Sequence, residues 1–417
     1  MKETPSHIQY PALREPIEIR VERHDGQAVL ILHCPLGIKE QPLVLNPVIA
    51  PVLQRFDGKR SLETIQHELS GQGATTELIL QVAQLLNDSL FLVGPTFEKA
   101  KADHIDAFKN ATVREPFLAG LSYSGTSEEL NNELNEYLLH GQAVSHLLHE
   151  NPLRCLMTPH IDYRRGHECY GRAFSALENQ QPDCILLIGT SHQYSPHLFH
   201  LTKKDFSSPL GVMHSDREII SAIANAYGEE RAFTDEYLHK REHSLELQIP
   251  FLQKFCPQSQ LIPILVGSFH PLIRDQRPRT RWEPYGSFVE ILAEQLEQKI
   301  FSRGRSIMIL AGVDMAHIGR FFGDTRELTE EWMESIRARD EEYLHHLQNQ
   351  DADKLFTHIA SDQDERRICG FPTMLTVLDL FDALGFRGKN ELLDYRQAVS
   401  RDNGCAVTFA GMAFYDN

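Results

Sequence analysis

The chain has 417 residues, a formal net charge of −17 and seven cysteines. This length exceeds that of one small domain and predicts two or three. The negative charge disfavours nucleic acids and anionic membranes as partners, because both repel an acidic surface. The sequence has no apolar run that could cross a bilayer, no secretory pattern at its start and no CxxC pair. We therefore expect a cytoplasmic protein without a disulfide framework or zinc ribbon.

Residues 1–96 are predicted to form a small winged-helix-like α+β domain. Residues 28–33 have the apolar pattern of a strand, and Ser61 is suited to cap a helix. The next helix is expected to bury four residues at helical spacing: Leu78, Val82, Leu85 and Leu86. The stretch FDGKRSLETI…LLNDSLFLVG resembles small peptide-binding domains of the PqqD type, and this resemblance implies a protein or peptide partner. Residues 97–113 are polar and predict a linker helix or tether.

Residues 114–417 have the pattern of an α/β domain, with short apolar runs separated by amphipathic helices. Four of these runs are predicted as buried strands: residues 153–158, 184–189, 261–266 and 307–312. Helical stretches between them are typical of a largely parallel or mixed sheet that is flanked by helices. Ligands of such sheets collect where the strands end, because the loops converge there.

A histidine follows each of the four predicted strands: His160, His192, His270 and His317. One histidine in a loop is usually structural, but four at equivalent positions favour a metal site, since imidazole is a common ligand of zinc, iron and copper. A fifth histidine, His243, stands where a helix is expected to begin. There it is either a general base, favoured in its neutral form by the helix dipole, or a capping residue without chemistry.

Six motifs occur in this order along the second domain: FLAGLSYSGTSEELNNELNEYL, MTPHIDYRRG, DCILLIGTSHQYSP, REHSLELQIPFL, LIPILVG and VDMAHIG. Together they resemble the MEMO family, also called AmmeMemoRadiSam system protein B. The resemblance implies a fold related to class III extradiol dioxygenases and a histidine-lined pocket for a metal ion. It makes His160 and His192 metal ligands and places His243 beside the metal.

The third ligand is less clear from the sequence. Some family members have cysteine at the position of Ala316, where this chain offers no thiolate, so His317 or Asp314 is expected to complete the site. Asp314 is either a carboxylate ligand or a residue that orients a ligating imidazole. Cys369, in the late family motif RRICGFP, either borders the pocket or is a buried small residue.

The leading functional hypothesis is a metal-dependent redox enzyme, an oxygenase or oxidase that acts on a small organic or peptide substrate. Iron is the expected metal, with copper or zinc as alternatives. In this interpretation His243 and Asp314 are catalytic, and His160, His192 and His317 hold the ion. Two other hypotheses stay open: a non-catalytic adaptor with a vestigial pocket, and a zinc-dependent hydrolase.

Overall fold

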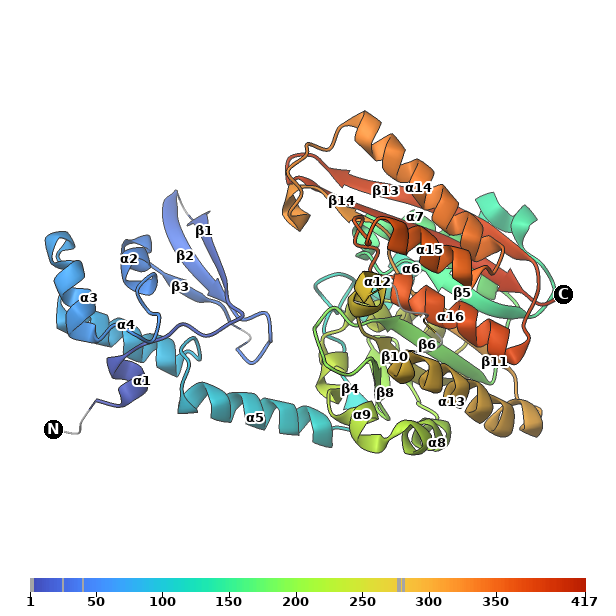
Figure 1. Ribbon diagram of the computed structural model, residues 1–417, viewed down its shortest axis with the longest axis horizontal. Helices are drawn as coiled ribbons and strands as arrows, with labels where there is room; N and C mark the ends of the chain where they lie inside the picture. Colours follow the sequence, from blue (N-terminus) through green and yellow to red (C-terminus); the bar gives the residue numbers. More distant parts are fainter. Residues whose placement is uncertain (1–3, 25, 40, 276–278, 280–281) are drawn as a thin grey trace. The chain divides into compact units, whose positions relative to one another are not determined.

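The computed structural model describes residues 4–24, 26–39, 41–275, 279 and 282–417. The chain divides into two compact units, residues 1–110 and 111–417, which we describe separately (Figure 1). The first unit contains three antiparallel strands in the order β1-β2-β3. The strands are β1 (Glu18–His24), β2 (Gln27–His33) and β3 (Leu43–Leu45). The helices are α1 (Ser6–Gln9), α2 (Ala50–Leu53), α3 (Leu62–Glu68), α4 (Thr76–Asp88) and α5 (Pro95–Asn110).

Local sequence signals explain the helices of the first unit. The Ser61 side chain caps α3 by accepting a hydrogen bond from the backbone N–H of Thr64, as the sequence predicts. The buried face of α4 differs from the predicted one, because Leu78 and Leu85 are exposed. Helical spacing allows two overlapping apolar stripes here, which share Val82 and Leu86, and the stripe that packs into the core is rotated toward Ile79 and Ala83. Its residues are Ile79, Val82, Ala83 and Leu86.

The predicted linker segment lies largely in helix α5, whose Phe97 and Phe108 are buried. The guanidinium of Arg14 lies 4.6 Å from the centre of the Phe97 ring, a cation–π contact within the first unit. Most of the segment that was expected to be a linker helix or a tether is therefore a helix with an anchored first turn.

The second unit is a mixed α/β domain, which confirms the predicted fold class. Its main sheet has the order β12-β14-β5-β11-β6-β10-β7, with β13 paired to β14. The strands of the second unit, within and outside this sheet, are β4 (Val113–Arg114), β5 (Leu153–Thr158), β6 (Cys184–Thr190), β7 (Phe199–Leu201), β8 (Asp205–Ser208), β9 (Gly211–Met213), β10 (Gln260–Val266), β11 (Ile307–Gly312), β12 (His317–Ile318), β13 (Asn390–Ser400) and β14 (Cys405–Tyr415). The four central strands β5, β11, β6 and β10 are parallel and coincide with the four predicted ones.

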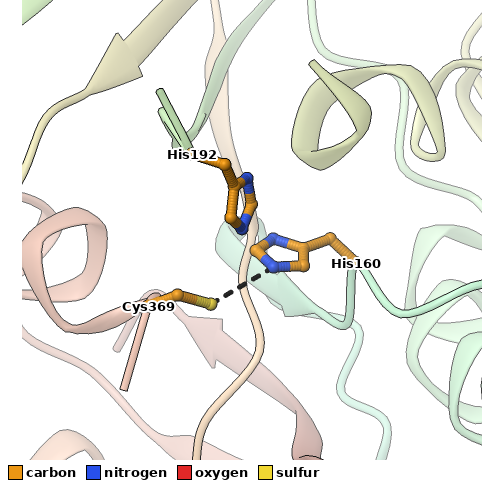
Figure 2. Close-up of side chains that lie close together, drawn as sticks. All are labelled: His160, His192 and Cys369. Carbon is orange, nitrogen blue, oxygen red and sulfur yellow. Dashed lines mark hydrogen bonds between the residues drawn. The ribbon is translucent and has the colours of Figure 1, made fainter. Parts of the chain in front are cut away.

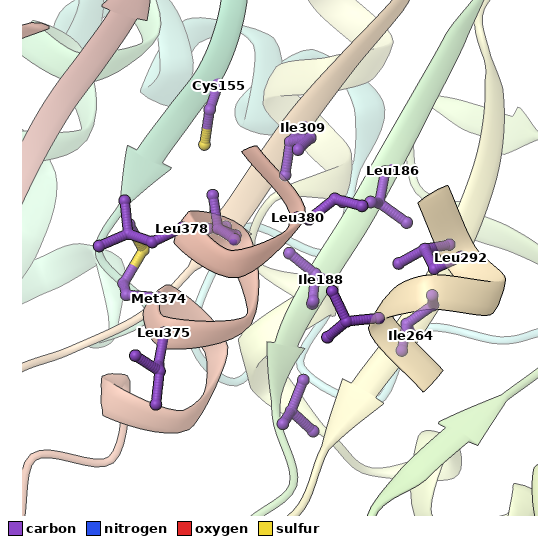
Figure 3. Packing of buried hydrophobic residues seen from close by; sticks show 14 of the residues in the cluster. Cys155, Leu186, Ile188, Ile264, Leu292, Ile309, Met374, Leu375, Leu378 and Leu380 are labelled. Atoms are coloured by element: carbon purple, nitrogen blue, oxygen red, sulfur yellow. The ribbon is translucent and has the colours of Figure 1, made fainter. Parts of the chain in front are cut away.

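Helices cover both faces of this sheet, and the central strands are buried along almost their whole length. The helices are α6 (Ser127–Leu138), α7 (Tyr163–Phe174), α8 (Arg217–Tyr227), α9 (Glu229–Phe233), α10 (His243–Glu246), α11 (Ile249–Phe255), α12 (His270–Asp275), α13 (Glu283–Lys299), α14 (Glu330–Gln348), α15 (Ala352–Ser361) and α16 (Phe371–Leu384). Figure 3 shows Leu375 and Leu378 of α16 and Leu292 of α13 packed on one face. On the other face Phe174 of α7 stacks on Phe251 of α11, with ring centres 4.2 Å apart.

The short helix α10 lies directly against the end of strand β11. A Cβ atom at Gly312 would lie 2.1 Å from the carbonyl oxygen of Ser244, so the close approach of α10 requires glycine at this position. This contact holds the first residue of α10, His243, beside the carboxyl ends of the parallel strands.

Candidate metal centre

Two histidines and one cysteine converge at the carboxyl ends of the central strands (Figure 2). His160 follows β5, His192 follows β6, and Cys369 comes just before α16. Their ligand atoms all lie within 4.8 Å of one another, and the Cys369 Sγ is 3.3 Å from the Nε2 of His160. Two imidazoles and a thiol at this separation form a group that could hold one metal ion.

The environment of His160 fixes the tautomer that a metal ligand needs. Its Nδ1 lies 3.0 Å from the carbonyl oxygen of Gly312, which can only accept a hydrogen bond, so Nδ1 carries the proton. Burial, followed by the neighbouring His192 and His243, holds the pKa of His160 well below its ordinary value. His160 is therefore neutral, and the lone pair on its Nε2 faces the thiol of Cys369.

His192 is oriented by a buried carboxylate that the sequence interpretation missed. Oε1 of Glu242 lies 2.8 Å from the Nδ1 of His192, and Oε2 accepts the backbone N–H of His192 at 3.0 Å. Although burial disfavours the charged imidazole, the Glu242 carboxylate raises the pKa of His192 well above its ordinary value. A metal ion that binds at Nε2 would displace the proton that the charged imidazole of His192 carries on this atom. Such a carboxylate–imidazole pair is the usual support of a ligating histidine. The sequence did contain a signal for Glu242, because this residue directly precedes His243, which the motifs had singled out.

Cys369 is held in place through its backbone. Its carbonyl oxygen accepts a hydrogen bond from the Thr190 hydroxyl at 2.8 Å, and the N–H of Gly370 donates to the carbonyl oxygen of Asp314 at 3.1 Å. A Cβ at Gly370 would lie 2.6 Å from that same oxygen, so glycine permits the close approach. Burial raises the pKa of the Cys369 thiol, and a metal ion would favour the thiolate form.

His243 lies against the two imidazoles of this group. Its ring stacks on His192, with centres 4.4 Å apart, and lies 4.9 Å from the ring of His160. Burial, followed by the neighbouring His192, lowers the pKa of His243 to about 4, so the ring is neutral and can accept a proton. The capping alternative is wrong, because the residue that caps α10 is Glu242, whose side chain accepts from the backbone N–H of Ser244.

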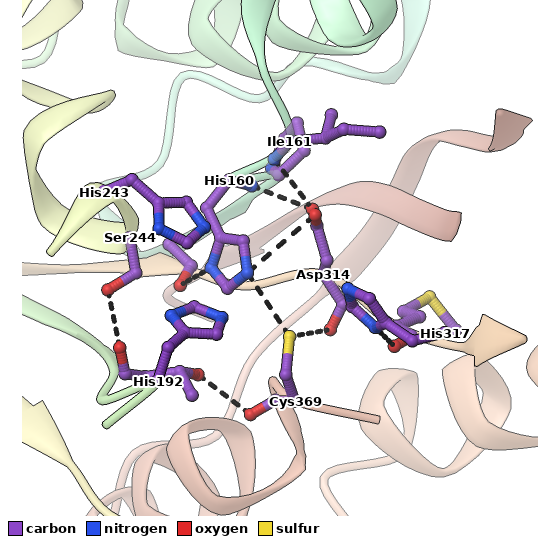
Figure 4. Close-up of polar contacts among 12 residues, drawn as sticks. His160, Ile161, His192, His243, Ser244, Asp314, His317 and Cys369 are labelled. Atoms are coloured by element: carbon purple, nitrogen blue, oxygen red, sulfur yellow. Dashed lines mark hydrogen bonds and ion pairs between the residues drawn. The ribbon is translucent and has the colours of Figure 1, made fainter. Parts of the chain in front are cut away.

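Asp314 orients His160 and is not a member of the ligand group. Its Oδ1 accepts the backbone N–H groups of His160 and Ile161 at 2.9 and 3.1 Å (Figure 4). Burial raises the pKa of Asp314 to about 7. Its other oxygen lies 3.8 Å from the Nε2 of His160, but Asp314 is not in the groups of three described residues whose ligand atoms all lie within 4.8 Å of one another.

The structure places His317 in the wall of the adjoining cavity and not in the group with His160 and His192. Its Nδ1 lies 3.0 Å from the carbonyl oxygen of Met315, and burial lowers its pKa to about 4. Among the described residues, the group that includes His160 and His192 is completed by the thiol of Cys369 and does not include His317 or Asp314. Ala316 offers no ligand atom, as expected, but a thiol reaches the site from a segment more than fifty residues later.

Two cavities adjoin the group. One of about 530 Å³ is lined by His160, His192, His243, Asp314 and His317 together with apolar residues. The other, of about 450 Å³, shares His192 and includes His270, which is exposed and outside the ligand group. Asp162 lines the first cavity but caps α7 and pairs with Arg165, so it contributes to helix geometry.

Two other groups of described residues bring ligand atoms within 4.8 Å of one another: the first joins Glu242 and His243 to His192, and the second is a separate cluster of Glu342, His346 and His358. The buried Arg366 donates from Nη2 to the Nε2 of His358 at 2.6 Å. Because a guanidinium can only donate, a neutral His358 carries its proton on Nδ1, the atom that faces Glu342. A protonated nitrogen does not coordinate a metal, so we assign no metal site to this cluster.

The comparisons with known proteins concern mainly the second unit. The family model for Memo-like proteins matches residues 114–413. A MEMO1 family protein of Aquifex aeolicus is 26% identical over 92% of this chain and 96% of its own length, and therefore extends into the first unit. Relatives from Nitrosopumilus maritimus and Thermus thermophilus are 24% and 26% identical over 72% and 77% of this chain, and cover 99% and 90% of their own lengths.

Among solved structures, an uncharacterized protein of Escherichia coli K12 aligns with 63% of this chain and 99% of its own, at 13% identity. Its TM-score of 0.37 is too low to add to the fold assignment. No helix in the described part of the chain is long and apolar enough to cross a membrane. The match of the family model to most of the second unit carries the assignment: the chain belongs to the Memo-like protein family.

Proposed function

We propose that the chain is a metal-dependent redox enzyme in which His160, His192 and Cys369 hold one ion. The observation that carries this proposal is the orientation of the two imidazoles. Each has its Nδ1 engaged by an oxygen acceptor, Gly312 in one case and Glu242 in the other, so each is prepared to present Nε2 to the same point.

The donor set bears on the choice of metal. Two imidazoles and a thiolate are softer than the nitrogen and oxygen set that the sequence favoured, and they suit iron, copper or zinc. We propose a redox-active ion, iron or copper, which when bound would supply the one-electron chemistry that side chains lack.

The protein residues around the group have distinct proposed roles. His243, neutral and stacked on His192, accepts a proton from a substrate in the cavity. Asp314 fixes the loop that carries His160 by accepting its backbone N–H. Glu242 holds the imidazole of His192 and balances its charge. The apolar cavity wall excludes water from the reacting substrate.

Metal analysis after anaerobic reconstitution tests this proposal. The parent chain should bind one Fe(II) or Cu(I) ion, and a His160→Ala, His192→Ala double variant should bind neither. His270→Ala is the matched control, because His270 also follows a central strand but lies outside the group. Undiminished metal binding by the double variant would refute the proposal. Binding of Zn²⁺ alone, with no spectroscopic signal and no redox reaction, would favour the hydrolase hypothesis instead.

A further inference from the structure

The loop that delivers Cys369 to the metal group has an unusual backbone. It follows α15, which ends at Ser361, and three of its residues have positive φ angles: 56° at Gln363, 55° at Asp364 and 52° at Arg367. Residues other than glycine rarely adopt this left-handed conformation, because their Cβ atom crowds the backbone. Such a conformation persists where the surrounding structure fixes it. The loop therefore needs firm anchors to hold the thiol of Cys369 in place.

The buried anchor of this loop is the side chain of Arg366. Its Nη1 donates to Oδ1 of Asp340 at 2.6 Å, and its Nη2 donates to the Nε2 of His358 at 2.6 Å. Asp340 lies on α14, and the two side chains of this ion pair are 1% and 0% exposed. Arg367 also pairs with a carboxylate, that of Asp324, but its side chain is 39% exposed, and exposed ion pairs contribute little. The pair of Arg366 and Asp340 is therefore the anchor that matters most.

Asp340 also receives hydrogen bonds from two strands of the main sheet. Its Oδ2 accepts from the hydroxyl of Thr408 on β14 at 2.6 Å and from the hydroxyl of Tyr395 on β13 at 2.9 Å. Together with Arg366, these partners place three donors around one side chain. An ionised carboxylate, which only accepts hydrogen bonds, fits this position, whereas an amide would turn a donor toward donors.

The same network joins the Cys369 loop to the segment that follows β11. The carbonyl oxygen of Arg366 accepts the backbone N–H of His317 at 2.8 Å. The Thr408 hydroxyl, which donates to Asp340, accepts the backbone N–H of Ala316 at 2.9 Å. Because a buried and connected network of this kind has one well-packed arrangement, a change at Asp340 would reach the loop that carries the thiol.

We propose that Asp340 is a positioning residue of the metal group. Through Arg366 it holds the left-handed loop in the conformation that places the Cys369 thiol 3.3 Å from the Nε2 of His160. Asp340 lines neither of the two cavities beside the group, so it acts on the site through the loop. The inference rests on the proposed function in one respect, that Cys369 is a ligand of the ion.

Alkylation of Cys369 in the metal-free, full-length chain tests this role. Cys369 and Cys405 are partly exposed, whereas the other five cysteines are buried, so Cys405 is an internal reference. Labelling with iodoacetamide, followed by peptide mass spectrometry, gives the reaction rate of each of the two thiols. Asp340→Asn should raise the rate at Cys369 about fivefold or more, because a released loop exposes the thiol, and leave the rate at Cys405 near that of the parent. An unchanged rate at Cys369 in the folded variant would overturn the inference.

Two further variants separate positioning from a general loss of stability. Glu246→Gln is the matched control, because Glu246 is also a buried carboxylate paired with a buried arginine, but its partners lie in residues 114–123. This variant should alkylate at Cys369 like the parent. Asp340→Asn leaves Arg366 as an unpaired buried charge, which destabilises the fold. The double variant Asp340→Asn, Arg366→Met removes both charges and decides the question if the single variant does not fold.

The double variant should show the same faster alkylation of Cys369 as the single variant. A rate like that of the parent in the folded double variant would overturn the inference. An equal rise in Glu246→Gln would also overturn it, because any loss of a buried ion pair would then loosen the thiol.

Titration with Co(II) separates this inference from the proposed function. The parent should show a thiolate-to-cobalt charge-transfer absorption that Cys369→Ser lacks, and Asp340→Asn should lose about half of its intensity or more while cobalt stays bound. Faster alkylation of Asp340→Asn in a chain that binds no metal would support the role of Asp340 and refute the proposed function. Full cobalt–thiolate absorption in Asp340→Asn would overturn the role of Asp340 and leave the proposed function intact.

Discussion

The carboxylate of Glu242 offers a direct probe of the proposed metal centre. It is 5% exposed, and its Oε1 lies 2.8 Å from the Nδ1 of His192 and 3.3 Å from the Nδ1 of His243. Glu242→Gln keeps the shape of the side chain but removes its charge. The charge-assisted hydrogen bond to His192, which contributes about 1.5–3 kcal/mol, becomes a neutral one that contributes about 0.5–1.5 kcal/mol, so about 1–1.5 kcal/mol is lost.

Each loss of about 1.4 kcal/mol in binding free energy lowers the metal affinity tenfold. We therefore expect Glu242→Gln to weaken metal binding by about 10-fold, the lower end of the range of about 10- to 100-fold that is typical of residues that orient ligating histidines. The measurement is a competition titration against a chelator of known affinity under anaerobic conditions, with folding checked by circular dichroism.

Glu246→Gln is the matched control for the loss of a buried carboxylate. Glu246 lies in the same short helix, is 1% exposed and pairs with Arg114, away from His192. The Glu246→Gln substitution should lower the free energy of unfolding and leave the metal affinity near that of the parent. If the two variants bind metal with equal affinity, Glu242 does not support His192 as a metal ligand. The same holds if the folded Glu242→Gln variant binds metal as tightly as the parent.

Three further predictions concern proton transfer, pH and domain structure. His243→Ala should retain metal stoichiometry while lowering turnover about a hundredfold or more, as oxygen consumption with an identified substrate would show; loss of the metal would instead make His243 a ligand. In the metal-free chain, Asp314 has a folded-state pKa of about 7 against 3.8 in the unfolded chain, so it binds more protons when folded and stability falls as pH rises from about 4 to 7. Asp314→Asn should flatten this fall by up to a few kcal/mol in urea unfolding, and an unchanged pH profile would argue against the buried carboxyl. Limited proteolysis should cut near residues 111 and 112, between α5 and β4, and release a stable fragment that begins near Arg114; recovery of no such fragment would indicate one shared core.

The central sheet could be predicted closely because its strands carry strong local signals. The strands β5 and β11 have the predicted bounds; β11 is a continuous apolar run, and β5 is apolar except at Arg154 and Thr158, as expected for parallel strands buried on both faces. The buried face of α4 was predicted only in part, with Leu78 and Leu85 on the wrong side. Sequence spacing defines the possible stripes of a helix but not which one the core accepts.

The candidate site was predictable where ligands follow strands and not where they come from elsewhere. His160 and His192 follow β5 and β6, two parallel strands that flank β11, so the topology brings both histidines to the same edge of the sheet. His270 follows β10 but is exposed at the start of α12, where it lines a different cavity. Cys369 enters ahead of α16, and no spacing rule connects it to His160, more than two hundred residues earlier. Its motif was visible in the sequence, but only the tertiary fold shows which pocket it reaches.

X-ray absorption spectroscopy of the anaerobically reconstituted chain tests the central claim most directly, because it identifies the atoms around the ion. The account predicts one sulfur and at least two imidazole nitrogens in the first coordination shell, with the sulfur absent in Cys369→Ser and an imidazole absent in His192→Ala. A first shell of nitrogen and oxygen alone in the parent chain, or a sulfur signal that survives Cys369→Ser, would contradict it.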